Sequence, residues 1–193
     1  MEKKVILIDE ETIQTRIKEL AQEINKDYKG KELTLICILK GSMYFFTDLT
    51  RHLDLDTNLE FMRISTYEGK ESKGKIDVKL DLDKPIKGKD VLVVEDIIDT
   101  GITLSFLLDY LAVREPKSIK LCTLLDKPDR RTEENVKVDY TGFIIPDRFV
   151  IGYGLDLDEK YRNLKEINCI IDENDRKKIE EEKKLIKKQI RKP

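Results

Sequence analysis

The sequence predicts an α/β protein, a single domain built on a mostly parallel, twisted sheet flanked by helices. Three continuous apolar runs, at residues 33–39, 90–96 and 118–126, are typical of strands that are buried on both faces. The first two runs each pass through a short loop into a segment whose apolar residues recur at helical spacing. Strands that alternate with helices in this way favour a parallel sheet with helices on both sides. A chain of 193 residues is long enough for one such domain and too short for two ordinary ones.

The remaining elements follow from shorter patterns. Apolar residues at helical spacing mark the helices, and short apolar runs between Pro, Gly and Asp turns mark the strands. The polar stretch at 67–79 contains Gly69 and Gly74, and we expect a mobile loop or a hairpin there. The other expected strands lie at 5–8, 59–66, 140–145, 149–153 and 167–171, and the expected helices at 13–24, 43–51 and 104–111.

Composition and charge argue against several classes of protein. A formal net charge of -2 gives no long-range attraction to nucleic acid or to an anionic membrane, so we expect neither as a partner. The amino end holds an apolar run of only four residues before acids intervene, which argues against a signal peptide or membrane anchor and favours a cytoplasmic location. Cys37, Cys122 and Cys169 lie in apolar runs without ligand spacing, and we expect buried, reduced thiols. His52 is the only histidine and has no nucleophile beside it, so acid–base chemistry is expected from carboxylates or lysines.

The last part of the chain has a different composition. From residue 172 onward it consists mainly of Glu, Lys and Arg. We expect a domain at residues 1–172 and a charged helical tail at residues 173–193. Because acids and bases are mixed along this tail, a solvated helix is favoured over a partner-binding element, although a part in oligomerisation stays open. Its apolar residues are Ile179, Leu185, Ile186 and Ile190.

The most informative segment is residues 91–104, VLVVEDIIDTGITL, in which a buried strand ends in paired acids and runs through a glycine-containing turn into a helix. Such a turn presents unpaired backbone N–H groups at the positive end of a helix dipole, which suits a phosphate. Gly101 lets the backbone approach closely, and the hydroxyls of Thr100 and Thr103 add donors. The segment therefore predicts a phosphate site.

The acids of the same segment predict what lies beside the phosphate. Glu95 and Asp96 could accept hydrogen bonds from sugar hydroxyls or hold a metal ion. Helix capping and pairing with lysines would explain one acid, but Glu95, Asp96 and Asp99 together would repel one another without a ligand or cation. A ribose phosphate fits both halves of the segment.

Residues 91–104 resemble the phosphoribosyl pyrophosphate motif of the type I phosphoribosyltransferases, and the core EDIIDTG resembles the hypoxanthine-guanine branch of that family. The resemblance extends in the same order over about residues 5–170, which argues against a chance match. It implies the family's fold, with a small hood built from the terminal segments. The other matching blocks are LKGS at 39–42, STY at 65–67, LLDKPDRR at 124–131, GFIIPDRFVIGYGLD at 142–156 and YRNL at 161–164.

The resemblance implies roles around the sugar and phosphates. Asp99 would be the general acid–base group near purine N7, and Glu95 and Asp96 would take the ribose hydroxyls, directly or through Mg²⁺. Asp156 would hold a second Mg²⁺ through water. The 5-phosphate would be bound by Thr100, Gly101, Ile102 and Thr103, and pyrophosphate by Lys40, Gly41 and Arg162, with a peptide in the pyrophosphate loop that is often cis in the family.

It also implies a purine site and a lid. Lys127 would donate to the 6-oxo group of the base, Phe149 would stack on its ring, and the backbone of Val150 would read its edge. Taken singly, Lys127 fits a surface lysine, Phe149 a core aromatic and Asp156 a turn acid, so only their order beside the phosphate motif favours function. The polar stretch that begins at Thr66 and Tyr67 resembles the family's closing lid, which would keep water from the reactive ribose.

We therefore expect a magnesium-dependent purine salvage enzyme that moves 5-phosphoribosyl from phosphoribosyl pyrophosphate to N9 of hypoxanthine or guanine, as a homodimer or homotetramer. One alternative is an enzyme of the same fold that prefers xanthine, adenine or a pyrimidine, but Lys127 and the Phe149–Val150 pair suit a 6-oxopurine. Another alternative is a same-fold RNA-binding regulator with little activity. A pI near 5.7 and the presence of Asp99 argue against it.

Overall fold

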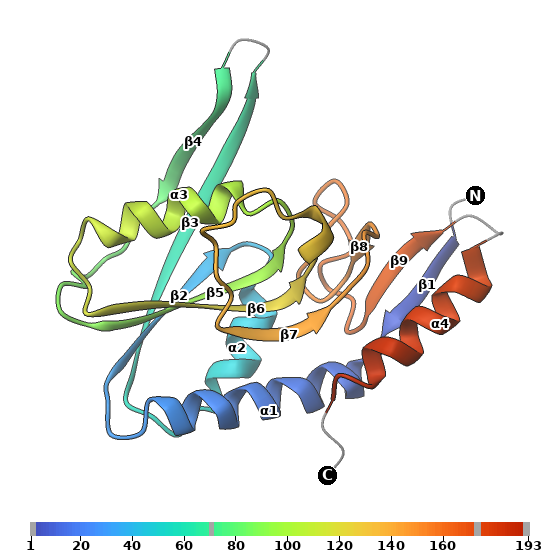
Figure 1. Ribbon diagram of the computed structural model, residues 1–193, viewed down its shortest axis with the longest axis horizontal. Coiled ribbons are helices and arrows are strands. Elements are labelled where there is room, and N and C mark those ends of the chain that lie inside the picture. Colours follow the sequence, from blue (N-terminus) through green and yellow to red (C-terminus); the bar gives the residue numbers. More distant parts are fainter. Residues whose placement is uncertain (1–2, 70–71, 172–174, 191–193) are drawn as a thin grey trace.

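A six-stranded sheet in the order β4-β3-β2-β5-β6-β7 forms the centre of the protein (Figure 1). Neighbouring strands are parallel from β3 to β7, and β4 runs antiparallel to β3 at the edge, which confirms the predicted fold class. The computed structural model describes residues 3–69, 72–171 and 175–190. The strands are β2 (Leu33–Leu39), β3 (Thr57–Gly69), β4 (Ser72–Leu80), β5 (Asp90–Ile98), β6 (Ser118–Asp126) and β7 (Tyr140–Ile144).

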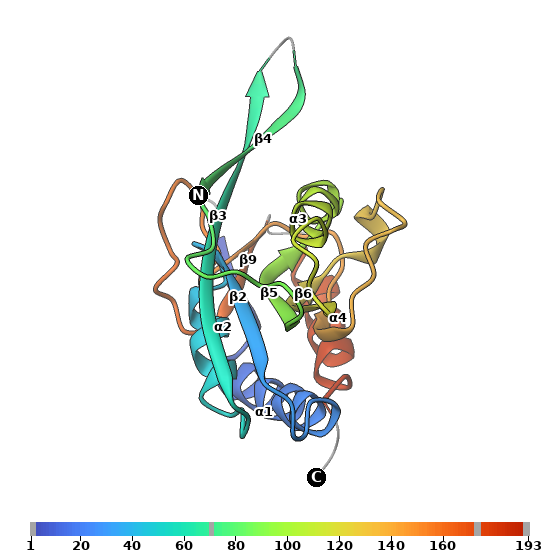
Figure 2. The same ribbon diagram turned by 90° about the vertical axis from the view of Figure 1, so that its left-hand side faces the viewer.

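Helices cover both faces of this sheet. Helices α1 (Glu10–Asp27) and α2 (Met43–Thr50) lie on one side, and α3 (Ile102–Ala112) lies on the other (Figures 1 and 2). Successive residues of β2 therefore enter different cores: Leu35 and Cys37 join the core under α1 and α2, whereas Ile36 and Ile38 join the core under α3. Burial on both faces explains the continuous apolar runs of the central strands.

The two ends of the chain form a second, smaller sheet beside the first. Strands β1 (Lys3–Ile8), β9 (Ile167–Ile171) and β8 (Val150–Ile151) pair antiparallel in the order β1-β9-β8. Helix α4 (Arg176–Lys187) packs alongside β1 (Figure 1). This arrangement confirms the expected hood of terminal segments.

Several strand boundaries differ from those expected. Strand β1 begins at Lys3 instead of 5, and β3 spans Thr57–Gly69 instead of 59–66. Strand β5 continues to Ile98 instead of ending at Asp96, so its pairing with β6 extends beyond Glu95 and Asp96. Strand β8 stops at Ile151 instead of 153, because Gly152 adopts a left-handed φ of 98° and turns the chain. The polar stretch after Thr66 forms a hairpin, the second of the two structures expected there, and β3 and β4 extend beyond the body of the protein (Figure 2).

Helix α4 is not the fully solvated helix that its composition predicted. Ile179 and Ile186, seven residues apart, lie on one face and are buried in the core that also contains Ile171. Leu185 lies on the outer face and is 61% exposed. The prediction considered only the mixed charges of this segment. It overlooked that two isoleucines at helical spacing are enough to pack one face of α4 against the core.

Two further expectations concern thiols and membranes. Cys37, Cys122 and Cys169 are free and buried, as expected. Across the described ranges, none of the helices combines the length and apolar character that a membrane span requires.

Candidate active site

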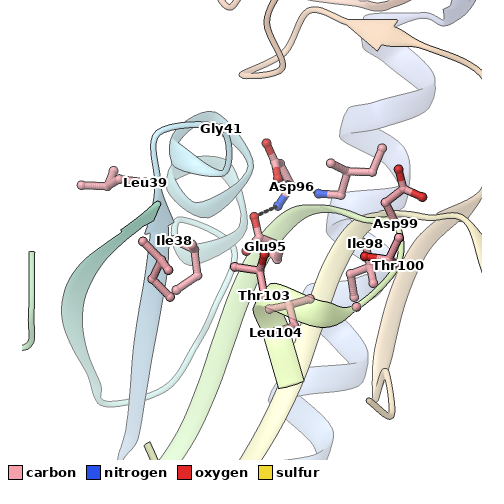
Figure 3. A pocket seen from close by; sticks show the side chains of 13 residues that line it. Ile38, Leu39, Gly41, Glu95, Asp96, Ile98, Asp99, Thr100, Thr103 and Leu104 are labelled. Atoms are coloured by element: carbon pink, nitrogen blue, oxygen red, sulfur yellow. Dashed lines mark hydrogen bonds between the residues drawn. The ribbon is translucent and has the colours of Figure 1, made fainter. Parts of the chain in front are cut away.

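The loops that follow β2 and β5 meet at one edge of the sheet because these two strands pair in parallel. Between the loops lies a pocket of about 290 Å³ (Figure 3). Its lining combines the ends of both strands with the first turn of α3. The predicted site residues that line it are Gly41, Glu95, Asp96, Asp99, Thr100, Gly101 and Thr103.

Glu95 and Asp96 form a half-buried acidic pair on the floor of this pocket (Figure 3). Oδ1 of Asp96 accepts the N–H of Ile97 at 2.7 Å, and the carboxylate lies so close to Gly41 that a Cβ there would stand 1.6 Å from Oδ2. Burial raises the pKa of both carboxyls, and the charge of Asp96 raises that of Glu95 further. The ionised pair would therefore be stabilised by a bound cation or by a hydroxyl that donates a hydrogen bond to it.

Magnesium fits this pair by chemistry. Mg²⁺ prefers oxygen ligands and is commonly held by one or two carboxylates together with oxygens of its substrate. Within the described ranges there is no group of three or more His, Cys, Asp or Glu side chains arranged to hold a metal. Glu95 and Asp96 are thus suited to a metal that arrives with a ligand rather than to a closed protein site.

The turn into α3 has the form of a phosphate cradle. Gly101 is the N-cap residue with a left-handed φ of 88°, and its carbonyl accepts the N–H of Ser105 at 2.8 Å. Gly101 has no side chain with which to cap the helix, so the first-turn N–H groups lack partners within the helix, and that of Ile102 lies 3.5 Å from Oγ1 of Thr100. The Thr100 carbonyl accepts the N–H groups of Thr132 and Glu133 at 3.0 and 3.2 Å, which fixes the turn.

A chain of charges connects Asp99 to the predicted purine site. Arg130 donates from Nε to Oδ1 of Asp99 at 2.8 Å and lies 3.4 Å from Asp147. Asp147 in turn pairs with Lys127 at 3.6 Å. Lys127 is buried, not a surface lysine, and Phe149 is 54% exposed, not a core aromatic. A purely structural role, as a surface lysine or a core aromatic, therefore does not explain Lys127 or Phe149.

The predicted pyrophosphate residues form a second cluster. Lys40, which follows a cis peptide bond after Leu39, lies 2.9 Å from Glu159. Arg162 contacts the same Glu159 oxygen at 3.5 Å and Oδ1 of Asp156 at 2.8 Å, and it donates to the Gly154 carbonyl at 2.7 Å. Its Nε is buried and has no hydrogen-bond partner among the described residues. Asp156 also accepts the N–H of Glu159, so in this structure it acts as a turn acid and as a partner of Arg162.

Gly41 connects the pocket to this cluster. Its Cα side lies against Asp96, and its carbonyl oxygen would stand 1.8 Å from a Cβ at position 154. The loop after β2 is therefore in direct backbone contact with the loop that carries Asp156 and Arg162. Of the remaining predictions, Val150 is buried and Ile102 is exposed, while the side chains of Thr66 and Tyr67 lie outside the part of the chain that the structure describes.

Sequence reasoning missed four charged residues of this region. Arg130 and Asp147 connect Asp99 to Lys127 through ion pairs. Glu159 pairs with Lys40 and Arg162, the two cations predicted to bind pyrophosphate. Arg131 stabilises the turn by donating to the Asp99 carbonyl at 3.2 Å. Each lies within four residues of a predicted site residue. That proximity is the one signal in the sequence that could have identified them.

Comparisons with known proteins agree with this geometry. The model of the phosphoribosyl transferase domain family matches residues 6–158. A hypoxanthine-guanine phosphoribosyltransferase from Mycobacterium avium is 47% identical over 174 residues, covering 86% of this chain and 85% of that protein. A hypoxanthine-guanine-xanthine phosphoribosyltransferase from Tritrichomonas foetus is 44% identical over 165 residues, covering 86% of this chain and 90% of that protein.

Solved structures give the same result. A crystal structure of a hypoxanthine-guanine phosphoribosyltransferase from Bacillus anthracis superposes with a TM-score of 0.82 and 47% identity, covering 89% of this chain and 99% of that one. Identity at this level over most of both chains extends well beyond the phosphate motif. The chain therefore belongs to the phosphoribosyltransferase family, in its hypoxanthine-guanine branch.

Proposed function

We propose that the protein transfers 5-phosphoribosyl from phosphoribosyl pyrophosphate to N9 of hypoxanthine or guanine, releasing pyrophosphate and the purine nucleotide for salvage. The observation that carries this proposal is the acidic pair of β5 facing the uncapped first turn of α3 across one pocket. A ribose that bears a 5-phosphate presents hydroxyls to the first and an anion to the second. Neither half alone selects a sugar phosphate.

The phosphate and ribose roles follow from these two halves. The backbone and hydroxyls of Thr100, Gly101, Ile102 and Thr103 would bind the 5-phosphate. Glu95 and Asp96 would accept hydrogen bonds from the ribose hydroxyls or hold Mg²⁺ on them. Bound Mg²⁺ would neutralise charge that develops on the departing pyrophosphate.

Asp99 is the carboxylate to which we assign proton transfer. It lies on the pocket lining and is joined through Arg130 to the side of the site that carries Lys127. We assign it the general acid–base role at purine N7, with Arg130 orienting its carboxylate. The histidine that commonly serves such a role is absent from the site, since His52 lies exposed beyond α2.

The leaving group and the base occupy the flanks. Lys40, the Gly41 backbone and Arg162 would bind pyrophosphate, and Asp156 would position Arg162 and hold a second Mg²⁺ through water. The free buried Nε of Arg162 supports an anion ligand there.

Lys127 would donate to the 6-oxo group, exposed Phe149 would stack on the ring, and the Val150 backbone would read its edge. The hairpin that holds Thr66 and Tyr67 would close over the ribose.

Four finer points complete the proposal. Residues 1–172 would form the catalytic domain and 173–193 an appended segment. The protein would act in the cytoplasm, which its free buried thiols support, and as a homodimer or homotetramer, which an exposed apolar strip on β3 at Leu59 and Phe61 supports. Xanthine is the second candidate base, favoured by the name of the Tritrichomonas foetus relative.

The test is nucleotide formation from phosphoribosyl pyrophosphate, with and without Mg²⁺, measured for hypoxanthine, guanine, xanthine, adenine and uracil. Asp99→Asn should lower kcat by about 10²-fold or more, as expected for loss of a positioned general base. Asp109→Asn, which removes an exposed acid of α3, is the matched control and should leave kcat unchanged. Absence of turnover with every base by folded protein would refute the enzyme and direct attention to RNA binding.

A further inference from the structure

The segment that carries the predicted purine contacts presents alternate side chains to opposite sides. Asp147 contacts Lys127 and Arg130 on the site side, and Phe149 is exposed. Arg148, between them, points the other way and contacts α4. Because Arg148 lies between Asp147 and Phe149 in the chain, its contacts with α4 constrain the backbone positions of both residues.

Arg148 is held by two acids of the C-terminal helix and its cap. Its Nε and Nη2 donate to the two carboxylate oxygens of Glu182 at 3.2 and 3.1 Å, and its Nη1 donates to Asp175 at 2.8 Å. The side chains of Arg148 and Glu182 are only 13% and 10% exposed. A bidentate pair with this little exposure fixes direction as well as distance, unlike a solvated surface pair.

A second contact holds the start of the same segment. The side-chain amide of Gln189, just after α4, donates to the carbonyl of Ile144 at 2.9 Å and accepts its N–H at 2.8 Å. Ile179 and Ile186 anchor the helix itself in the core. The stretch from residue 144 to residue 148 is thus fixed at both ends by the C-terminal segment, although the family model that matches this chain ends at residue 158.

We propose that α4 is a positioning element for purine binding, in which Glu182 acts through Arg148 to set the placement of Phe149 and Asp147. This inference rests on the proposed purine roles of Phe149 and Lys127. Glu182 touches none of the residues assigned to substrate, so it is a positioning residue and not a catalytic one.

The geometry also limits what α4 can affect. The phosphate turn and the acidic pair are positioned by β5 and α3 and by hydrogen bonds from residues 131–133, whereas the Asp99 carboxylate is connected through Arg130 to Asp147. Loss of Glu182 removes the bidentate partner of the Arg148 guanidinium and leaves the single contact to Asp175, which does not fix the direction of the side chain, so we expect the side chain to shift. The movement is passed to Phe149 and Asp147 and not to the phosphate turn, so affinity for the base should change while affinity for phosphoribosyl pyrophosphate should not.

The full-length chain offers a matched pair of variants on one helix. Glu182→Ala removes the contact to Arg148, whereas Lys187→Met removes the ion pair that joins the same helix to Asp9 at the start of α1, at 2.8 Å. We expect Glu182→Ala to raise the KM for hypoxanthine by about three- to tenfold, with the KM for phosphoribosyl pyrophosphate unchanged. Glu182→Gln, which keeps an acceptor for Arg148, should recover most of the loss, and Lys187→Met should leave both KM values unchanged.

Phe149→Ala separates this inference from the function on which it rests. If Phe149→Ala raises the KM for the base and Glu182→Ala does not, α4 has no positioning role and the purine site stands. If Phe149→Ala leaves that KM unchanged, the assignment of the purine site fails, and the inference fails with it. Equal effects of Glu182→Ala and Lys187→Met, or a parallel rise in both KM values, would show general loosening of α4 and would also overturn it.

Discussion

At the scale of single residues, the site of this protein already contains an anion where pyrophosphate is proposed to bind. One oxygen of Glu159 contacts both Lys40 and Arg162, the two cations assigned to the leaving group. Lys40 lowers the pKa of the Glu159 carboxyl, with Arg162 contributing less, so the group is charged at neutral pH. Pyrophosphate would therefore compete with Glu159 for both cations.

Replacement of Glu159 should strengthen pyrophosphate binding. Because ion pairs of exposed groups are weak, Glu159→Gln should tighten the Kd for pyrophosphate by only roughly two- to fivefold, measured by titration calorimetry. Asp158→Asn removes the same charge one residue away, and no ion pair among the described residues involves Asp158. If both variants tighten binding equally, overall charge and not displacement of Glu159 accounts for the change.

At the scale of elements, the two ends of the chain stabilise each other through Asp9. Its carboxylate caps α1 by accepting the N–H of Thr12 at 2.8 Å and pairs with Lys187 at the end of α4. Burial alone would raise the pKa of Asp9, but hydrogen bonds from Lys187 and Thr12 outweigh it and lower the pKa to about 2. A carboxyl whose pKa is lower in the folded state than in the unfolded state stabilises the fold only while it is ionised.

Stability should consequently fall as pH drops through this range. The contribution of Asp9 is complete above about pH 4 and is lost as pH falls toward 2, and partial exposure limits it to about 1 kcal/mol. We expect the free energy of unfolding of Asp9→Asn, from urea titrations, to be lower than that of the parent at pH 6. The two proteins should converge near pH 2, and a constant difference between them would contradict the role given to Asp9.

The elements also show which features could be predicted from sequence. The central strands were predictable because burial on both faces requires an unbroken apolar run, as in LTLICIL. The end of β8 depended on the left-handed conformation of Gly152, and the packing of α4 depended on Ile179 and Ile186 among many charges. In the site, the turn at 99–103 was predictable from one contiguous motif. The partners of Asp99, Lys127 and Lys40 were not, because each lies on another segment that only the folded chain brings near.

At the scale of the whole molecule, β3 carries an apolar strip that the rest of the described chain leaves exposed. Strand β4 pairs with β3 only from Arg63 onward, which leaves the first half of β3 at the edge of the sheet. Leu59 and Phe61 are exposed there, and the ring of Phe61 lies 5.5 Å from Phe46 of α2. An exposed strand edge with apolar side chains is commonly covered by another chain.

Phe61→Glu should therefore disrupt the proposed homo-oligomer. A charge placed in an apolar interface must be desolvated without a partner, so we expect a shift to monomer in light scattering coupled to gel filtration. Val113→Glu, at a position that is 78% exposed beyond α3, is the control and should leave the oligomer intact. An unchanged mass for folded Phe61→Glu would place the interface elsewhere.

The backbone contact between Gly41 and Gly154 restricts how this protein and its descendants can vary. A Cβ at position 154 would lie 1.8 Å from the Gly41 carbonyl oxygen, so Gly154 cannot acquire a side chain unless the backbone of the loop after β2 moves as well. A Cβ at position 41 would lie against the Asp96 carboxylate, so replacement of Gly41 would instead have to displace a residue of the acidic pair. A lineage that lost Gly154 would therefore need a simultaneous change in a loop more than a hundred residues away in sequence. The loops that carry Gly41 and Gly154 would therefore be expected to change together in evolution. A new leaving-group preference would more readily arise by substitution of Lys40 or Glu159 than by a change in the backbone of these loops.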